Sequence, residues 1–286
     1  MSRRRLDAEL VRRRLVASRE AAQRLIADGQ VTVGGVTATK PATHVDESAA
    51  IDIRSGGDRV YVSRGAYKLI GALDAFPIDV TGRTALDAGA STGGFTQVLL
   101  ERGATRVIAV DVGYGQLAWP VRSQDSVIVM ERTNVRYVRP EDLPFAPEVI
   151  VADLSFISLT TVLPALAALA APDADLLVMV KPQFEVGKDK VGQGVVTDPA
   201  LRRTAVSQGA GAAVDLGLDV HGVVASPLPG PKGNVEYFLW MTKSPGDAGR
   251  VSGDDGPMDH RHVRPPALDA SGVASAIAAA VEAGPQ

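Results

Sequence analysis

The segment Leu86-Asp-Ala-Gly-Ala-Ser-Thr-Gly-Gly-Phe95 decides the fold of this 286-residue chain. It follows a short apolar strand at residues 85–86 and opens a helix, and ligands of open α/β sheets bind at such junctions. Gly89 allows a tight turn beside a ligand, and Gly93 and Gly94 allow the helix to start close to the strand. The spacing G-x-x-x-G-G differs from the dinucleotide pattern G-x-G-x-x-G. The segment therefore predicts a different ligand, or else a glycine-rich turn without one.

Acidic side chains flank this turn. Asp87 precedes the glycines, where it disfavours a pyrophosphate and favours a sulfonium or ammonium group. Asp111 ends the next strand, 22 residues after Gly89, where an acid can bind ribose hydroxyls. Asn134, after the third strand, is either an adenine contact or a turn residue. These features resemble class I S-adenosylmethionine (SAM) methyltransferases. The resemblance implies a cofactor site made of Asp87, Gly89, Ala90, Ser91, Thr92, Gly93, Gly94, Phe95, Asp111 and Asn134.

Apolar strands alternate with helices from Thr84 to Met241. This alternation predicts an α/β domain with a mainly parallel sheet covered by helices, and the methyltransferase resemblance implies a Rossmann-like sheet of seven strands. The expected strands are residues 85–86, 107–110, 127–130, 149–152, 176–180, 220–224 and 235–240. A helix that starts after Ser63 precedes them.

Residues 1–58 form a separate unit in this interpretation. Apolar spacing predicts helices around residues 6–15 and 18–28, and Val31-Thr-Val33 with the turn Gly34-Gly35 predicts a hairpin. The segments Arg5-Leu-Asp-Ala-Glu-Leu-Val and Val31-Thr-Val-Gly-Gly resemble an S4-like RNA-binding domain. A linker at 59–62, a catalytic domain at 63–243 and a mostly disordered tail at 244–286, with a weak helix at 273–281, complete the expected organisation.

The charge distribution indicates that the small unit binds a polyanion. Residues 1–40 hold nine lysines and arginines against four acidic residues, whereas the whole chain has a net charge of −3. Such a basic module is typical of nucleic-acid binding, although a solvated helix face has the same pattern. A basic, glycine-containing loop at 182–199 either closes on RNA or is an ordinary surface loop. The candidate RNA-binding residues are Arg4, Arg12, Arg14, Arg19, Lys188 and Lys190.

Composition excludes several classes of protein. The chain has no cysteine and four histidines, so we expect no disulfide, no cysteine nucleophile and no metal site. The longest apolar stretch, Thr160 to Ala171, contains Pro164 and is too short to span a bilayer. No apolar run follows the N-terminal arginines, so no secretory signal is expected. We expect a monomer that is located in the cytoplasm and does not associate with a membrane.

Four charged residues stand where a ligand crevice is expected. Asp153 and Lys181 each follow an apolar strand, Glu236 lies within Asn234-Val-Glu-Tyr-Phe-Leu-Trp240, and Lys68 flanks the apolar face of the helix before the first strand. Taken alone, Glu236 could lie on an edge strand and Lys68 on a helix surface. Together they resemble the Lys-Asp-Lys-Glu catalytic tetrad of FtsJ-like ribose 2′-O-methyltransferases.

The surrounding segments resemble one family more closely, the TlyA-type (hemolysin A) rRNA methyltransferases. They include Ser63-Arg-Gly-Ala-Tyr-Lys-Leu, Asp153-Leu-Ser-Phe-Ile-Ser and Lys181-Pro-Gln-Phe-Glu-Val-Gly-Lys. The resemblance implies SAM-dependent methylation of a cytidine 2′-hydroxyl in 16S or 23S rRNA, of the kind that confers capreomycin and viomycin sensitivity. Lys181 can act as a base only when it is neutral, and burial and a second cation, Lys68, favour that form. Either Lys181 or Asp153 could take the proton.

Two other functions compete with this interpretation. Methylation of a base amine stays possible because Asp153-Leu-Ser-Phe stands where N-methyltransferases carry an acidic or amide residue followed by two prolines and an aromatic residue. Those prolines are missing here. A membrane-lytic hemolysin would need a spanning or strongly amphipathic segment, and none is visible.

Overall fold

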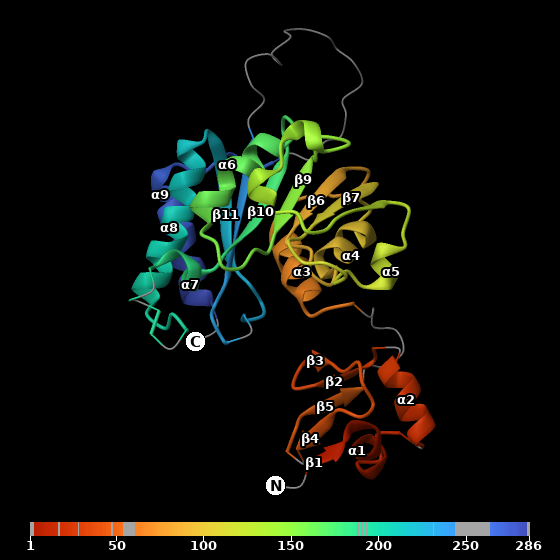
Figure 1. The fold of residues 1–286 in the computed structure, drawn as a ribbon. Coiled ribbons are helices and arrows are strands. Elements are labelled where there is room, and N and C mark those ends of the chain that lie inside the picture. The colour runs from red at the N-terminus through yellow and green to blue at the C-terminus, as the bar shows by residue number, and fades with distance from the viewer. Residues whose placement is uncertain are drawn as a thin grey trace. The chain divides into compact units, whose positions relative to one another are not determined.

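The computed structural model of the chain describes residues 3–16, 18–27, 29–46, 48–53, 61–187, 189, 191–192, 194–230, 232–243 and 264–284. Its contacts divide the chain into two compact units, Met1–Ala66 and Tyr67–Gln286, which are described separately below (Figure 1). Residues 59 and 60 of the linker expected at 59–62 lie outside the described residues.

The small unit packs two helices against short strands. Its elements are β1 (Arg3–Arg5), α1 (Leu6–Arg12), α2 (Arg19–Ala27), β2 (Val31–Val33), β3 (Val36–Thr37), β4 (His44–Asp46) and β5 (Ile51–Ile53). β2 pairs with both β3 and β5, and β1 pairs with β4. The buried core includes Leu6, Leu10, Ile26 and Val31. The expected helices and the hairpin are present, with Gly34 and Gly35 at φ +57° and +76°. The sequence did not predict β1, β4 and β5, because strands of three residues carry almost no alternation.

The large unit contains a seven-stranded sheet. Its order is β11-β12-β10-β9-β6-β7-β8, and β12 runs antiparallel to both of its neighbours while the other pairs are parallel. The strands are β6 (Thr84–Ala88), β7 (Arg106–Val110), β8 (Val127–Met130), β9 (Val149–Ala152), β10 (Asp175–Val180), β11 (Leu218–Ala225) and β12 (Tyr237–Lys243). The predicted mainly parallel seven-stranded sheet is confirmed.

Helices cover both faces of this sheet. Figure 1 shows α6, α8 and α9 on one face and α3 and α4 on the other. The helices are α3 (Gly65–Ala75), α4 (Gly94–Glu101), α5 (Trp119–Arg122), α6 (Leu159–Leu169), α7 (Pro182–Glu185), α8 (Pro199–Asp215) and α9 (Ala270–Ala283), with the 3-10 turns η1 (Val135–Tyr137) and η2 (Pro140–Asp142). Because both faces are covered, β9 and β10 are buried along their whole length.

The C-terminal segment corrects an expectation. Residues 244–263 lie outside the described part, but disorder is wrong for residues 264–284. There α9 packs on β11 and α8 through Ile277, Ala280 and Val281. Asp269 caps this helix by accepting a hydrogen bond from the Gly272 amide at 2.7 Å. Because this segment is rich in alanine and glycine, the sequence predicted only a weak helix at 273–281, although its apolar residues recur at helical spacing. No helix in the described parts of the chain is long and apolar enough to cross a membrane.

Candidate active site

One edge of the sheet gathers the four charged residues of the predicted tetrad. Asp153 directly follows β9, and Lys181 directly follows β10, the parallel neighbour of β9. Glu236 directly precedes β12, which is antiparallel to β10 and therefore starts at the edge where β10 ends. The sequence had suggested that Glu236 lies inside the strand. In the structure it lies just before the strand. Lys68 reaches this edge from the first turn of α3.

The four side chains form a continuous chain of ion pairs. The Nζ of Lys68 lies 2.6 Å from Glu236 Oε2 and 3.8 Å from Asp153 Oδ2. The other oxygen of Asp153, Oδ1, lies 2.5 Å from Lys181 Nζ. Asp153 therefore bridges two lysines, and the order Glu236–Lys68–Asp153–Lys181 alternates in charge.

Burial makes this arrangement energetically demanding. Glu236 is 1% exposed, Lys68 5% and Lys181 6%, whereas the Asp153 side chain keeps 21% exposure. Lys68 is therefore not a surface helix lysine. A buried charge without a partner costs several kcal/mol, so each member depends on its neighbour. The partial exposure of Asp153 leaves an approach to the lysine pair.

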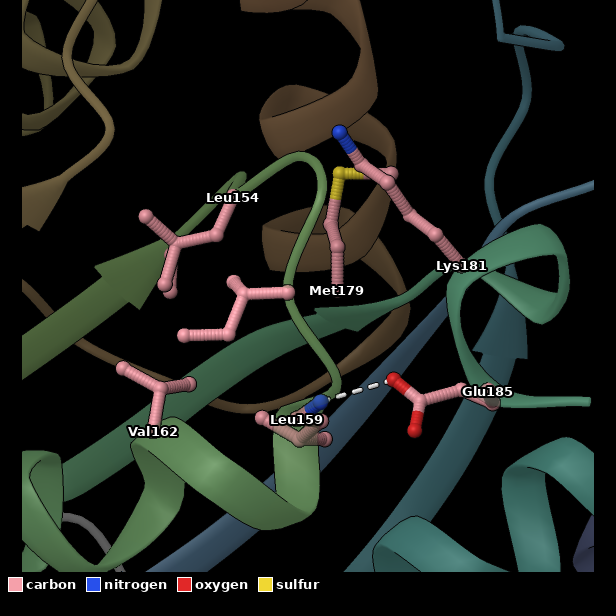
Figure 2. Close-up of a pocket in the computed structure, with 8 residues that line it drawn as sticks. Leu154, Leu159, Val162, Met179, Lys181 and Glu185 are labelled. Atoms are coloured by element: carbon pink, nitrogen blue, oxygen red, sulfur yellow. Dashed lines mark hydrogen bonds between the residues drawn. The ribbon is translucent and has the colours of Figure 1, made fainter. Parts of the chain in front are cut away.

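A short helix holds the loop that follows β9 in place. α7 begins after Lys181 and contains Glu185, whose carboxylate accepts hydrogen bonds from the Leu159 amide at 2.7 Å and from Ser158 Oγ at 2.5 Å. Figure 2 shows Glu185 bonded to Leu159 at one end of the loop and Lys181 extending past Met179. Burial raises the pKa of the Glu185 carboxyl. Lys181 and Glu185 thus fasten both ends of the loop at 153–159.

That loop and α7 enclose a small, mainly apolar pocket beside Lys181 (Figure 2). The pocket has a volume of about 270 Å³ and is lined by Ala152, Leu154, Ile157, Leu159, Val162, Met179, Lys181 and Glu185. The stem of Lys181 therefore has apolar neighbours, while its Nζ lies among polar groups.

Three residues next to the tetrad were missed from the sequence. Lys181 Nζ donates a hydrogen bond to Ser155 Oγ at 3.0 Å, and Gln183 Nε2 lies 3.5 Å from Glu236 Oε1. Phe156 is 91% exposed at φ +66°, an uncommon conformation for a residue with a side chain. Their only sequence signal is adjacency to Asp153 and Lys181.

The glycine turn behaves as its sequence predicts. Gly89 has φ +86°, and a Cβ there would lie 2.8 Å from the carbonyl oxygen of Asp153. Gly93 has φ +97°, and its Cβ would lie 2.8 Å from Leu117 Cδ1. Side chains at these positions would be strained, and at Gly89 the clash would displace the loop that carries Asp153. The turn and the tetrad are therefore in direct contact.

Asp87 is fully buried beneath this turn. Its Oδ2 accepts a hydrogen bond from Thr96 Oγ1 at 2.6 Å, and its Oδ1 has no hydrogen-bond partner among the described residues. Burial raises the pKa of the Asp87 carboxyl to about 7, with a smaller contribution from the negative charge of Asp153. A carboxylate in this state favours a cationic ligand, which would offset its desolvation.

Asp111 shapes a second pocket at the same edge. Its two oxygens accept hydrogen bonds from the Ser91 amide at 2.8 Å and the Gly113 amide at 2.7 Å. The pocket is lined by Ala90, Ser91, Ala109, Asp111, Gly113, Gln116, Leu117, Val129 and Glu131. Its apolar floor and acidic rim suit a nucleoside, with a ribose at the carboxylates.

Two predicted cofactor residues have structural roles. Phe95 is 4% exposed and stacks on Phe238 with ring centroids 6.1 Å apart. Asn134 accepts a hydrogen bond from the Arg136 amide at 3.1 Å and caps η1, which is the turn role that the sequence also allowed. Ala90 and Thr92 lie in the turn, and Gly94 is the first residue of α4.

The candidate RNA-binding arginines of the small unit are only partly as expected. Arg4 and Arg14 are exposed. Arg12 lies 2.7 Å from the buried Glu9, and Arg19 lies 3.1 Å from the buried Asp7. Arg12 and Arg19 are therefore held by ion pairs within the unit and do not simply point outward. Lys188 and Lys190 lie outside the described residues.

Two family models match the chain. The FtsJ-like methyltransferase model matches residues 61–243, and the S4 domain model matches residues 4–51. A solved structure from Streptococcus thermophilus, described as a hemolysin, superposes with a TM-score of 0.69 at 34% identity, covering 99% of this chain and 97% of that one.

Curated relatives resemble the chain over most of its length. The 16S/23S rRNA (cytidine-2′-O)-methyltransferase TlyA of Mycobacterium tuberculosis is 58% identical over 238 residues, which cover 83% of this chain and 89% of the relative. Hemolysin A of Brachyspira hyodysenteriae is 35% identical over 82% of this chain and 98% of its own length. The 23S rRNA (cytidine-2′-O)-methyltransferase TlyA of Campylobacter jejuni is 37% identical over 65% of this chain and 72% of its own length.

The buried ion pairs predict a non-additive effect on stability. Lys68→Met leaves Glu236 without its nearest cation and should lower the free energy of unfolding by about 3–5 kcal/mol. Lys68→Met combined with Glu236→Gln removes both charges and should regain more than half of that loss. Denaturant unfolding followed by Trp240 fluorescence measures both variants. A double variant as unstable as the sum of the two single variants would contradict the coupling.

Proposed function

The chain belongs to the FtsJ-like methyltransferases, and from this premise we propose that it transfers a methyl group from SAM to the ribose 2′-hydroxyl of cytidine in 16S or 23S rRNA. Its relatives of M. tuberculosis and C. jejuni carry the name of this activity. The single observation that supports the chemistry best is the buried chain Glu236–Lys68–Asp153–Lys181 at the edge where β9 and β10 end.

Each tetrad member has a separate task in this proposal. A ribose hydroxyl must lose its proton as it becomes a nucleophile, and Lys181 Nζ, 2.5 Å from Asp153, is the group that takes it. Asp153 orients Lys181 and links it to Lys68. Glu236 holds Lys68 in place at 2.6 Å, and Lys68 in turn lies 3.8 Å from the carboxylate that orients Lys181. A lysine can do this work because, unlike an arginine, it can give up its proton.

The cofactor fits the residues at the glycine turn. Asp87, whose Oδ1 has no hydrogen-bond partner among the described residues, would stabilise the positive charge of SAM from beneath the turn, and Asp111 would bind its ribose beside Ser91 and Gly113. When bound there, SAM supplies an electrophilic methyl group on a positively charged sulfur. Because the Gly89 turn contacts the backbone of Asp153, the cofactor and the tetrad share one edge of the sheet, and positioning accounts for much of the rate.

The other two candidate activities find less support. Methylation of a base amine would leave the lysines without a task, and Leu154-Ser-Phe156 takes the place of the prolines. Some relatives carry the name hemolysin. In the described parts of this chain, however, no helix could span a membrane. The exposed ring of Phe156, whose centroid lies 5.3 Å from that of Phe184, suits a base of single-stranded RNA, on whose face an aromatic side chain can stack.

SAM binding should depend on the ionisation of Asp87. In the free protein its pKa is raised to about 7, and a cationic ligand stabilises the carboxylate and lowers that pKa. SAM affinity should therefore rise as the pH increases through 7, and binding at pH 7 should release part of a proton. Calorimetry in buffers of different ionisation enthalpy measures the release. Asp87→Asn should bind more weakly and without this release, and equal release from both proteins would contradict the assignment.

Lys181 should be essential for chemistry and dispensable for cofactor binding. Lys181→Ala should abolish methyl transfer and leave SAM affinity within about threefold, because the lysine faces the acceptor. Lys181→Arg keeps the positive charge beside Asp153 but cannot act as a base, so it should be equally inactive. Single-turnover methyl transfer to rRNA measures both variants. Substantial activity of Lys181→Arg would make Lys181 an electrostatic group rather than the base.

The small unit should supply much of the RNA affinity. Arg4→Glu with Arg14→Glu should weaken rRNA binding, and each lost phosphate contact should reduce the log–log salt slope by roughly 0.7–0.9. These two arginines are preferred to Arg12, whose reversal would also break its pair with Glu9. Arg203→Glu on the exposed surface of α8 is the charge-reversal control for each of the two single variants, Arg4→Glu and Arg14→Glu. An unchanged slope in the double variant would show that this surface is merely solvated.

The product should carry the methyl group on ribose oxygen. A free 2′-hydroxyl attacks the adjacent phosphodiester in alkali, and a 2′-O-methyl group cannot. rRNA treated with this protein and SAM should therefore gain one alkali-resistant linkage at a cytidine, detected by primer extension after partial hydrolysis. A gain of one methyl mass with normal cleavage there would identify a base methyltransferase instead.

A further inference from the structure

Two buried carboxylates organise the arginines of the small unit. Asp7 and Glu9 lie two residues apart in α1, and neither is exposed to solvent. A carboxylate is rarely buried unless it is fully paired, and both of these are surrounded by guanidinium groups. The arrangement is costly, and nothing in the methyl-transfer chemistry requires it.

Asp7 accepts hydrogen bonds from several directions. Arg5 binds it with both ends of its fork, at 3.1 Å from Nε to Oδ1 and 2.9 Å from Nη2 to Oδ2. Arg19, the first residue of α2, donates to Oδ2 at 3.1 Å, and Gln23 donates to the same oxygen at 3.3 Å. The Ala8 amide donates to Oδ1 at 2.8 Å. These contacts hold the pKa of the Asp7 carboxyl well below its usual range.

The arginines around Asp7 keep an outward face. The side chain of Arg5 is 44% exposed and that of Arg19 is 56% exposed, although their common partner is fully buried. A guanidinium has five N–H groups in a rigid plane. Arg5 uses two of them on Asp7 and Arg19 uses one. Two cations that would otherwise repel each other are thus held beside one anion, with N–H groups left for a second acceptor.

Glu9, on the same helix, also binds two arginines. Arg12 binds it with Nε to Oε2 at 2.8 Å and with Nη2 to Oε1 at 2.7 Å. Arg13 donates from Nε to Oε1 at 2.8 Å and also from Nη1 to the Ala49 carbonyl. The neighbouring Arg3–Asp46 pair is different, because both side chains are exposed, 67% and 40%, and joined by one contact of 3.3 Å.

We propose that Asp7 is a positioning residue for nucleic-acid phosphates: it fixes the guanidinium planes of Arg5 and Arg19 before RNA arrives. A free arginine side chain loses rotational entropy when it binds a phosphate, and one already held in place loses much less. The phosphate then accepts hydrogen bonds from the guanidinium N–H groups that the carboxylate does not use. This inference rests on the proposed rRNA substrate and adds Arg5 to its contacts.

The proposal predicts a change in RNA affinity opposite to the change that charge alone predicts. Asp7→Asn removes a negative charge from a surface that binds a polyanion, so charge alone would strengthen RNA binding. Loss of positioning instead predicts about tenfold weaker binding of 23S rRNA transcript by the full-length protein. The control Asp46→Asn removes the same charge from an exposed pair and should bind as tightly as the wild type or slightly more tightly.

Methyl-transfer kinetics separate positioning from a structural role. Asp7→Asn should raise KM for rRNA about tenfold and leave kcat and SAM affinity unchanged. Binding by Asp7→Asn as tight as that of the wild type would overturn the proposal. Should Asp7→Asn fail to fold, Arg19→Lys decides the matter, because it keeps the charge on an exposed side chain and loses the fork. Weaker binding by Arg19→Lys supports the proposal, and unchanged binding overturns it.

The outcomes for the proposed function are distinct. Wild-type protein that methylates rRNA ribose, while Asp7→Asn binds as the wild type does, overturns the positioning role alone. Wild-type protein without measurable rRNA affinity overturns both proposals.

Discussion

The ion pair between Lys181 and Asp153 joins the two central strands at the edge where the chemistry is expected. β9 and β10 are parallel neighbours, so the residues that follow them must lie side by side, and opposite charges there remove the repulsion that two like side chains would have. Lys68 and Glu236 extend the pair in both sequence directions, from α3 before the sheet and from the start of β12 at its end. One line of charges thereby connects α3, β9, β10 and β12.

This dependence explains why the site and the fold are hard to separate. Gly89 must be a glycine because the Asp153 carbonyl occupies the space of its Cβ, and Gly230 likewise accommodates the Glu236 carboxylate, whose Oε1 would lie 2.6 Å from a Cβ at that position. Glu185 fixes the far end of the loop that begins with Asp153. A change at any of these positions reaches the lysines through contacts of one or two residues, without touching a substrate.

The sequence predicted what depends on local pattern. The strand alternation, the glycine turn and the charged residues after two buried strands follow from local pattern, and they placed Asp153 and Lys181 at one edge. Lys68 and Glu236 joined them only through the resemblance to the FtsJ-like methyltransferases. Patterns could not reveal the environment of each group. Lys68 and Arg19 look alike in the sequence as cations on helices, yet one is buried among carboxylates and the other is half exposed. The sequence predicted only a weak C-terminal helix at 273–281, because the stability of α9 comes from packing on β11 and α8 rather than from propensity.

The two units use carboxylates to hold cations, with opposite consequences. In the small unit the cations are arginines, which keep their charge under all conditions, and their outward faces stay accessible while Asp7 and Glu9 are buried. In the large unit the cations are lysines, they are buried themselves, and the partly exposed member is the carboxylate of Asp153. An arginine held in this way can only attract a phosphate, whereas a lysine held in this way can also exchange a proton. In the proposed function, the choice of cation and the side that is buried therefore distinguish the RNA-binding residues of the small unit from the catalytic residues of the large unit.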